Sequence, residues 1–400
     1  MIEPKVIKDN MNIISTSQEL KQLCKGLSSQ NFITIDTEFL REKTYYPKLC
    51  LVQLSDPDKN AVTIDPLAKG IDLKPLYELL ANENVLKVFH AGRQDLEIFY
   101  IQGDVVPQPF FDTQIAAMVC GFGDSVGYEK IVRDVTGVQI DKSSQFTDWS
   151  LRPLSNKQLS YALGDVTHLV DVYHHLANEL EKKNRTSWLL QEEEILSDPA
   201  TYVNDPYEVW KKVKLRSPNA KTLIVLKELA AWREQQARRK NIPKNWIMKD
   251  ETLAAIAQAA PNNKDKLSSI RNISKDMASS HTGETIIGLV KTALDTPKEH
   301  WPQAPERKKQ LSSSASATLD ILKMLLKIQS AEHGVAAKLI ASSDDLELIA
   351  RGETKNLPAL RGWRYDVFGK DALDLKAGKI AIGLNKGQIT KIRIKNGQES

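Results

Sequence analysis

The chain has 400 residues, more than one ordinary domain holds, so we expect two or three domains. Its composition, 41% hydrophobic and 26% charged residues, is typical of a globular protein in water, and its apolar runs are far shorter than the roughly 18 residues of a membrane span. The first residues, MIEPKVIKDN, lack the cationic and then apolar pattern of a secretory signal. Three cysteines without CxxC spacing argue against a disulfide framework or a cysteine zinc site, which favours a cytoplasmic location.

The net charge of +4 conceals a division along the chain. Residues 1–205 hold 20 Lys and Arg against 30 Asp and Glu, whereas residues 206–300 hold 18 against 10 and residues 301–400 hold 17 against 11. An acidic first half and a basic second half are expected when one part of a protein acts on a polyanion and another part binds it. Chance variation of solvated surfaces would give the same counts, so the interpretation depends on the motifs.

The first 200 residues alternate between strand-like and helix-like patterns. The first helix is predicted over residues 15–27, with Ser15 or Ser17 near its start. Strands that first follow one another and later alternate with helices predict a mixed sheet flanked by helices. The predicted elements are a helix at 15–27, strands at 31–39, 50–56 and 61–66, a helix at 72–81, a strand at 85–90 and a helix from Gln94.

Helical patterns dominate after residue 150. The longest predicted helix is amphipathic and has Ser155 as its N-cap. Another predicted helix is basic at its end and stops at Pro243. The predicted segments are a helix over 155–183, a linker over 196–210, helices over 209–294, a second linker over 296–316 and a terminal hairpin over 375–394.

Two acidic residues stand at the end of the strand FITIDTEFL. Side chains at positions i and i+2 of a strand share a face, so Asp36 and Glu38 point the same way. Adjacent carboxylates repel each other, and a divalent cation, Mg²⁺ or Mn²⁺ for hard oxygen ligands, is the usual compensation. The alternative is that Asp36 caps a turn and Glu38 reaches solvent.

Further polar residues follow a later strand and lie on the long helix. In FHAGRQDLEIF, Asp95 falls in the first turn of a helix, where the helix dipole favours a carboxylate with or without a metal. His90, at the strand end, is more typical of a hydrogen-bonded residue and is left out of the predicted metal set. Tyr161 and Asp165 are four residues apart on a helix and share a face with apolar residues, so Asp165 is expected to be partly buried and in need of compensation.

Taken together, Asp-x-Glu on a first strand, Asp after a later strand and Tyr-x-x-x-Asp on a late helix resemble the three exonuclease motifs of the DEDD superfamily. Tyr at position 161 is typical of its tyrosine branch. The resemblance implies a ribonuclease H-like α/β fold, with a mixed five-stranded sheet flanked by helices. The stretches that are similar to bacterial ribonuclease D, strongly over residues 12–200, are DTEFLREKTYYPKLCLVQL, FHAGRQDLEIF, FDTQIAAMVCG and TDWSLRPLSNKQLSYALGDVTHL.

This resemblance also implies a metal site and a reaction. Tyr161 would orient the attacking water. The implied enzyme is a 3′–5′ exoribonuclease that uses a two-metal-ion mechanism, releases 5′-mononucleotides from RNA and acts on precursors of tRNA. The sequence leaves the oligomeric state open. The residues that the resemblance assigns to two divalent cations, Mg²⁺ or Mn²⁺, are Asp36, Glu38, Asp95 and Asp165.

The basic half of the chain resembles helical modules. Residues 210–294 are similar to an HRDC domain, in which we expect Trp232 and Trp246 to be core residues. Residues 318–385 look like the C-terminal helical region of ribonuclease D and are interpreted as a second, HRDC-like module. A basic cluster could bind RNA phosphates or simply cap a helix. The members of this cluster are Arg238, Arg239, Lys240 and Lys244.

The fold class predicted from these patterns is an α/β exonuclease domain followed by two all-α HRDC-type domains. A DNA 3′–5′ exonuclease of the proofreading type, which uses the same carboxylates, is one alternative function. A non-catalytic RNA-binding protein is another. The predicted boundaries are 1–205 for the exonuclease domain, 206–295 for the HRDC domain, 296–317 for a linker and 318–400 for the HRDC-like region with a hairpin.

Overall fold

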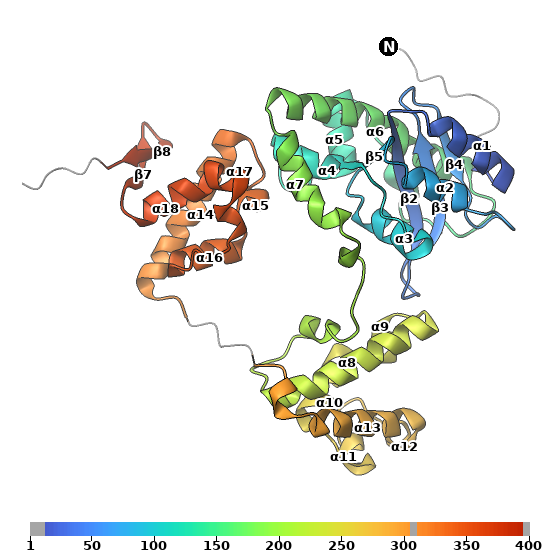
Figure 1. Ribbon diagram of the computed structural model, residues 1–400, viewed down its shortest axis with the longest axis vertical. Helices are drawn as coiled ribbons and strands as arrows, with labels where there is room; N and C mark the ends of the chain where they lie inside the picture. Colours follow the sequence, from blue (N-terminus) through green and yellow to red (C-terminus); the bar gives the residue numbers. More distant parts are fainter. Residues whose placement is uncertain (1–12, 305–309, 395–400) are drawn as a thin grey trace, which may run out of the picture.

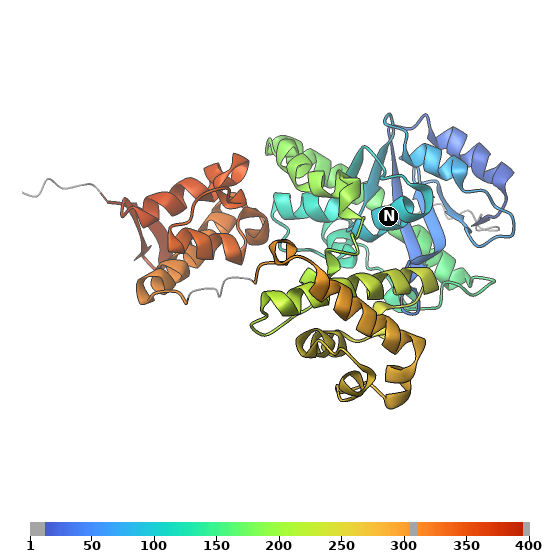
Figure 2. The ribbon, with the colours of Figure 1, turned by 60° about the horizontal axis from the view of Figure 1, so that its bottom comes forward.

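The structure is a computed structural model that describes residues 13–304 and 310–394. The expectation about a secretory signal falls on residues outside these ranges, as do parts of the predicted second linker and of the predicted C-terminal region. Figures 1 and 2 show three domains joined by single segments of chain. We call them the N-terminal domain (β1 to η2), the central domain (η3 to η4) and the C-terminal domain (α14 to β8).

The N-terminal domain is built on one mixed sheet. Its strand order is β1-β4-β3-β2-β5-β6, in which β2 runs antiparallel to β3 and parallel to β5. The sequence predicted a mixed sheet, and the structure confirms it. Among the described residues the sheet has six strands rather than five, because the two-residue β1, too short to show a pattern, pairs with the β4 edge. The strands are β1 (Ile13–Ile14), β2 (Phe32–Leu40), β3 (Lys48–Ser55), β4 (Ala61–Ile64), β5 (Leu86–Phe89) and β6 (Phe110–Asp112).

Helices cover both faces of this sheet. Ile33 and Ile35 pack with the first three helices on one face, whereas Phe32 and Val88 pack with α4, α5 and α6 on the other. Burial on both faces is why the first half of β2 is a nearly continuous apolar run. The helices are α1 (Ser17–Leu27), α2 (Lys74–Leu80), α3 (Arg93–Gly103), α4 (Thr113–Cys120), α5 (Tyr128–Thr136), α6 (Asn156–Lys182) and α7 (Thr186–Ser197), with short 3₁₀ helices η1 (Lys142–Ser144) and η2 (Pro199–Thr201).

Two helix starts test the capping predictions. Ser155 caps α6 and forms a capping box with Gln158, as predicted. The prediction that Ser15 or Ser17 lies near the start of the first helix is confirmed, since α1 begins at Ser17; its cap is Thr16, which forms the same kind of box with Glu19. All three residues can cap a helix, and the sequence alone does not separate neighbouring candidates.

The central domain is helical, as predicted. The long α8 ends because Asn241 adopts a left-handed conformation at φ 49°, two residues before the predicted stop at Pro243. Trp232 packs against the domain core, but Trp246 is 61% exposed, so its predicted core position was wrong. The helices are η3 (Val209–Lys212), α8 (Ala220–Lys240), α9 (Lys244–Ile247), α10 (Asp250–Ala259), α11 (Lys264–Ser268), α12 (Lys275–Ser279), α13 (His281–Asp295) and η4 (Lys298–His300).

The C-terminal domain has a helical core and ends in a two-stranded hairpin. The hairpin lies within the stretch predicted for it, so this domain is not entirely α-helical. No helix in residues 13–304 or 310–394 is long and apolar enough to cross a membrane. The elements are α14 (Ser313–His333), α15 (Ala337–Ile340), α16 (Ser343–Arg351), η5 (Pro358–Leu360), α17 (Gly362–Arg364), the π-helical turn η6 (Tyr365–Gly369), α18 (Lys370–Lys376), β7 (Ile380–Asn385) and β8 (Gln388–Arg393).

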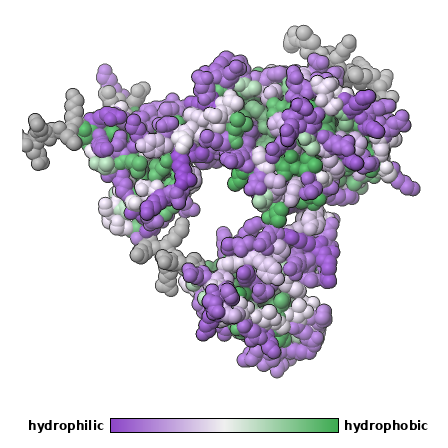
Figure 3. Space-filling view, viewed as in Figure 1, coloured by the Kyte–Doolittle hydropathy of each residue, from purple (hydrophilic) through white to green (hydrophobic). Residues whose placement is uncertain are grey.

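The C-terminal domain docks on the N-terminal domain through two stacked tryptophans. The rings of Trp188 in α7 and Trp363 in α17 lie 4.5 Å apart at an angle of 11°. The guanidinium of Arg185 lies 4.7 Å above the Trp188 ring, and that of Arg364 lies 4.8 Å from the Trp363 ring. In the space-filling view an open gap separates the C-terminal domain from the central domain (Figure 3), so the two basic domains contact the N-terminal domain at different places.

Candidate active site

Three of the predicted carboxylates meet in one group. Asp36 and Glu38 project from β2 and Asp165 from α6, and one carboxylate oxygen from each lies within 4.8 Å of the other two. Within residues 13–304 and 310–394, no other group of three or more His, Cys, Asp or Glu residues meets this criterion. Asp165 is buried, whereas Asp36 and Glu38 are partly exposed, so the group opens to solvent on the β2 side.

Two hydrogen bonds that the sequence did not predict hold α6 over β2 at this point. The hydroxyl of Thr34, two residues before Asp36, donates to the backbone carbonyl of Val166 at 2.8 Å. The hydroxyl of Tyr128 in α5 donates to the carbonyl of Asp165 at 2.6 Å. Since these bonds fix the turn of α6 that carries Asp165, Thr34 and Tyr128 position that carboxylate relative to β2. No local sequence pattern identifies them, because each bond joins residues that are far apart along the chain.

Asp95 lies beside the group of three and not within it. It is buried in the first turn of α3, as predicted, and accepts a hydrogen bond from the hydroxyl of Thr37. Burial and then the charge of Asp36 raise the pKa of Asp95, and the charge of Asp95 adds to the burial that raises the pKa of Glu38. The structure therefore brings all four predicted acidic residues together, with Asp95 at the edge of the cluster.

Because the cluster is buried, keeping its carboxylates ionised without a positive partner costs free energy. Burial and then the neighbouring carboxylates raise the pKa of Glu38 to about 10, and burial raises the pKa of Asp165 to about 7. Burial likewise raises the pKa of Asp36 and of Asp95 above its ordinary value. Among the described residues the nearby cation is Lys142 of η1, which acts on Asp165. A pocket of oxygen ligands with almost no compensating charge fits hard divalent cations.

Tyr161 stands one helical turn before Asp165 and contacts it. Its hydroxyl hydrogen-bonds to the Asp165 carboxylate, and its ring lies 6.1 Å from that of Trp149. Burial, followed by the charges of the carboxylates, raises the pKa of Tyr161 well above the ordinary tyrosine value. The hydroxyl therefore keeps its proton and donates it in a hydrogen bond to the Asp165 carboxylate, while its oxygen can still accept a hydrogen bond at the edge of the cluster.

His90 has a different environment from the carboxylates. Its Nδ1 lies 2.9 Å from the hydroxyl of Thr113, and its ring lies 5.3 Å from the ring of Tyr128. Burial lowers the pKa of His90, which favours the neutral ring. His90 thus packs behind Tyr128, one of the residues that position Asp165.

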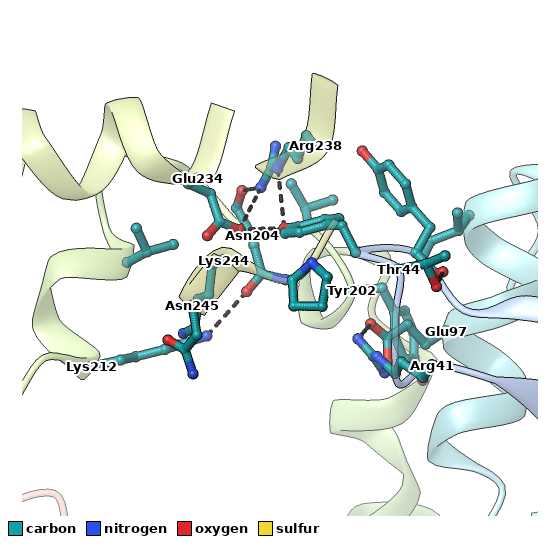
Figure 4. Close-up of a pocket in the computed structure, with 16 residues that line it drawn as sticks. Arg41, Thr44, Glu97, Tyr202, Asn204, Lys212, Glu234, Arg238, Lys244 and Asn245 are labelled. Atoms are coloured by element: carbon teal, nitrogen blue, oxygen red, sulfur yellow. Dashed lines mark hydrogen bonds and ion pairs between the residues drawn. The ribbon is translucent and has the colours of Figure 1, made fainter. Parts of the chain in front are cut away.

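The four basic residues predicted to bind RNA differ in their environments. Arg238 donates to the backbone carbonyl of Asn204 and to the hydroxyl of Tyr45 (3.1 Å), so it joins the central domain to the N-terminal domain. Arg239 is exposed and donates to the neighbouring Gln236 side chain at 2.8 Å. Of the other two, Lys240 is exposed at the end of α8, and Lys244 lines the pocket drawn in Figure 4.

Comparisons with known proteins agree with this geometry. A family model described as 3′-5′ exonuclease matches residues 11–181, and one described as HRDC domain matches residues 223–290. Ribonuclease D of Nitrobacter hamburgensis is 45% identical over 96% of this chain and 99% of its own length, and ribonuclease D of Bartonella henselae is 47% identical over 95% and 93%.

Similarity to a solved structure extends over nearly the whole fold. The crystal structure of Escherichia coli RNase D, described as an exoribonuclease involved in structured RNA processing, superposes with a TM-score of 0.79 at 30% identity. The match covers 92% of this chain and 99% of that one. The chain therefore belongs to the ribonuclease D family of 3′–5′ exoribonucleases.

Proposed function

We propose that this protein shortens RNA from the 3′ end by hydrolysis, releases 5′-mononucleotides and acts on tRNA precursors with single-stranded 3′ ends. The observation that carries the proposal is the group formed by Asp36, Glu38 and Asp165, within 4.8 Å of one another, with Asp95 beside it. All four acidic residues are present, which argues against a non-catalytic RNA-binding protein. The involvement of the E. coli relative in structured RNA processing supports a folded RNA as the substrate.

The residues of the cluster fit two divalent cations, Mg²⁺ or Mn²⁺. Asp36, whose pKa is raised by burial and then by Asp165, and whose charge adds to the burial that raises the pKa of Asp95, would contribute to holding both ions. Glu38 and Asp165 would hold one ion, and Asp95 would hold the other. When bound, such ions would neutralise the phosphate that the carboxylates alone repel, and would supply Lewis-acid activation of the water and of the leaving oxygen.

The protein's own contribution is to orient the water and the substrate. The Tyr161 hydroxyl, next to Asp165, is placed to hold the attacking water in line by a hydrogen bond, which is a positioning role. Tyr128 and Thr34 keep Asp165, and with it Tyr161, at a fixed height above β2. A water molecule held in this way attacks the last phosphodiester bond, and the 3′ oxygen of the preceding nucleotide leaves.

Charge supports a division of work between the domains. The N-terminal part has a net charge of −10 over residues 1–205, so a polyanion is not attracted to it as a whole. The central and C-terminal parts are both basic and can hold the body of an RNA molecule by its phosphates without reading its sequence. All three cysteines are free, which is consistent with the reducing cytoplasm that we propose as its location.

The proposal is tested by digesting RNA labelled at its 5′ end and carrying a single-stranded 3′ tail. With Mg²⁺ or Mn²⁺ we expect a ladder of products that shorten one nucleotide at a time, and no products with chelator. Internal cuts, or digestion that persists in chelator, would contradict the proposal. A DNA strand of matched sequence decides against the proofreading alternative, since we expect slower digestion of DNA than of RNA.

A further inference from the structure

A pocket of about 460 Å³ lies where the central domain meets the N-terminal domain (Figure 4). The wall on the side of the N-terminal domain is formed by the segment that follows β2, which includes Arg41 and Tyr46, and by Glu97 of α3. Its other wall includes Lys212 of η3 and Lys244 of α9. The volume lies within the roughly 300–1,000 Å³ of pockets that hold small ligands, so it admits a nucleotide-sized unit and not a duplex.

Two ion pairs in the pocket wall contribute no net charge to the pocket. Arg41 donates both terminal nitrogens to Glu97, each at 2.8 Å. Arg238 lies 3.5 Å from Glu234, which also accepts a hydrogen bond from Tyr45. These side chains have their partners within the wall. The second pair lies within α8, and the hydroxyl of Tyr45 connects it to the N-terminal domain (Figure 4).

Two lysines remain without a charged partner. The Nζ of Lys212 donates to the neutral side-chain oxygen of Asn204 at 3.1 Å. Lys244 forms no side-chain hydrogen bond or ion pair with the described residues of the chain. Both lie on the central-domain side of the pocket, opposite Arg41 and Glu97 (Figure 4). The lining residues therefore leave a net charge of +2, which favours an anion.

Two elements, β2 and α3, lead from the carboxylate cluster to the pocket. Arg41 comes directly after the end of β2, three residues beyond Glu38. Glu97 follows Asp95 by two residues in α3. The pocket thus lies beyond the cluster, towards the central domain.

We propose that this junction pocket binds the phosphate backbone of RNA a short distance upstream of the 3′-terminal nucleotide, with Lys212 and Lys244 contacting phosphates. The inference rests on the proposed function, because the carboxylate cluster defines where the 3′ end lies. Tyr46, 36% exposed in the same pocket, offers an aromatic face on which a base can stack. Stacking and phosphate contacts do not depend on sequence, as an exonuclease that removes successive nucleotides requires.

The pocket exists only while the two domains are docked. The backbone amide of Tyr46 donates to the side-chain oxygen of Asn241 at 3.0 Å, and Arg238 donates to the hydroxyl of Tyr45 at 3.1 Å. These bonds hold the β2–β3 segment of one domain against α8 and its C-terminal end in the other. The role of Arg238 is accordingly to build the pocket, whereas Lys244 contacts the RNA.

The test compares two double variants of the full-length protein. Lys212→Gln/Lys244→Gln removes both unpaired charges of the pocket. Lys266→Gln/Lys275→Gln is the matched control, since it removes two exposed lysines of α11 and α12 that do not line the pocket. Each protein is assayed on a dinucleotide and on a long single-stranded RNA, with thermal unfolding as the check that all variants fold.

For the pocket variant we expect a several-fold higher KM on long RNA, with kcat and all dinucleotide kinetics unchanged. Two lost phosphate contacts should also reduce the slope of log KM against log salt by about 1.4, at about 0.7 for each contact. The control variant should match the wild type.

Several outcomes would overturn the proposal. One is a wild-type KM for the pocket variant on long RNA, and another is an equal loss in both double variants. A third is a variant that binds 5′-AMP less tightly but long RNA normally, because the pocket would then hold the released nucleotide. A wild-type protein inactive on both substrates would instead refute the proposed function itself.

Discussion

At the scale of single residues, protonation is the central issue in this protein. Four carboxylates are packed together, and burial raises the pKa of each of them. A buried carboxylate either takes up a proton or finds a positive partner. Without a bound cation the cluster must hold protons at neutral pH, so binding of a divalent ion has to displace them.

This competition predicts how metal binding depends on pH. The pKa of Glu38 is about 10 and that of Asp165 about 7 without metal. Affinity for Mn²⁺, measured by calorimetry, should therefore increase from about pH 6 to about pH 8, with proton release. The metal-free protein should show the opposite trend in stability. Because these folded-state pKa values lie above the unfolded ones, protonation stabilises the fold, and stability is lost as the pH rises through them.

The corresponding check is thermal unfolding in chelator and in Mn²⁺. In chelator, the melting temperature should be higher at about pH 6 than at about pH 8, and Mn²⁺ should raise it most at the higher pH. A Mn²⁺ affinity that does not change over this range would mean that the cluster is already ionised, contrary to the raised pKa values.

Tyr161→Phe tests whether the hydroxyl positions water. The variant loses one hydrogen bond and keeps the ring against Trp149, so we expect kcat to fall about tenfold or more with KM nearly unchanged. Since the pKa of Tyr161 is raised above its ordinary value, the pH–rate profile of the variant should keep the shape of the wild type. A loss confined to KM, or a titration that disappears with the hydroxyl, would contradict the role given to Tyr161.

Sequence reasoning correctly placed the residues whose positions follow from local spacing. Asp36 and Glu38 share a face because a strand has a period of two, and Tyr161 and Asp165 because a helix has a period of 3.6. It did not find Thr34 or Tyr128, whose bonds to α6 depend on tertiary packing.

The basic run at the end of α8 shows the same limit. Its charges suggested a solvent-facing cluster, yet Arg238 is engaged with Tyr45 of the other domain and the preceding Glu234 is buried. The sequence does not show that the β2–β3 segment docks on α8. It therefore cannot tell that Arg238 is engaged in that contact whereas Lys244 is available to a ligand.

At the scale of elements, strongly periodic segments were predicted well and short ones were not. The long helix α6 and strands β2 to β5 carry enough residues to show their period, whereas β1 and the three-residue β6 do not. The aromatic stack between α7 and α17 was also missed, because each tryptophan lies in an unremarkable helical stretch. Its contact holds the C-terminal domain on the N-terminal domain.

Trp363→Ala should therefore destabilise the protein strongly. Trp363 is 5% exposed and lies in the core of the C-terminal domain as well as on Trp188, so its loss should lower the free energy of unfolding by about 3–5 kcal/mol. Trp246→Ala, at a position 61% exposed, is the matched control and should change stability by about 0.5 kcal/mol or less. Chemical denaturation measures both. Equal effects of the two substitutions would refute the structural role assigned to the stack.

At the scale of the whole molecule, an acidic catalytic domain carries two basic domains on separate sites. A truncation after residue 205 tests the division of work. It keeps Leu196 and Tyr202, which belong to the core of the N-terminal domain, so this domain should fold. We expect normal turnover of short single strands but much weaker binding of tRNA-like RNA, measured by filter binding. Equal affinity of the truncated and complete proteins for tRNA-like RNA would show that the basic domains do not hold the substrate.

The central claim is that the carboxylate cluster is a divalent-metal site. The most direct measurement is anomalous scattering from crystals soaked in Mn²⁺, for the wild type and for Asp165→Asn. For the wild type we predict a peak bonded by Asp36, Glu38 and Asp165 and a second one on the Asp95 side, and for the variant a weaker or missing first peak. A wild-type map without any peak among these carboxylates at saturating Mn²⁺ would contradict the account.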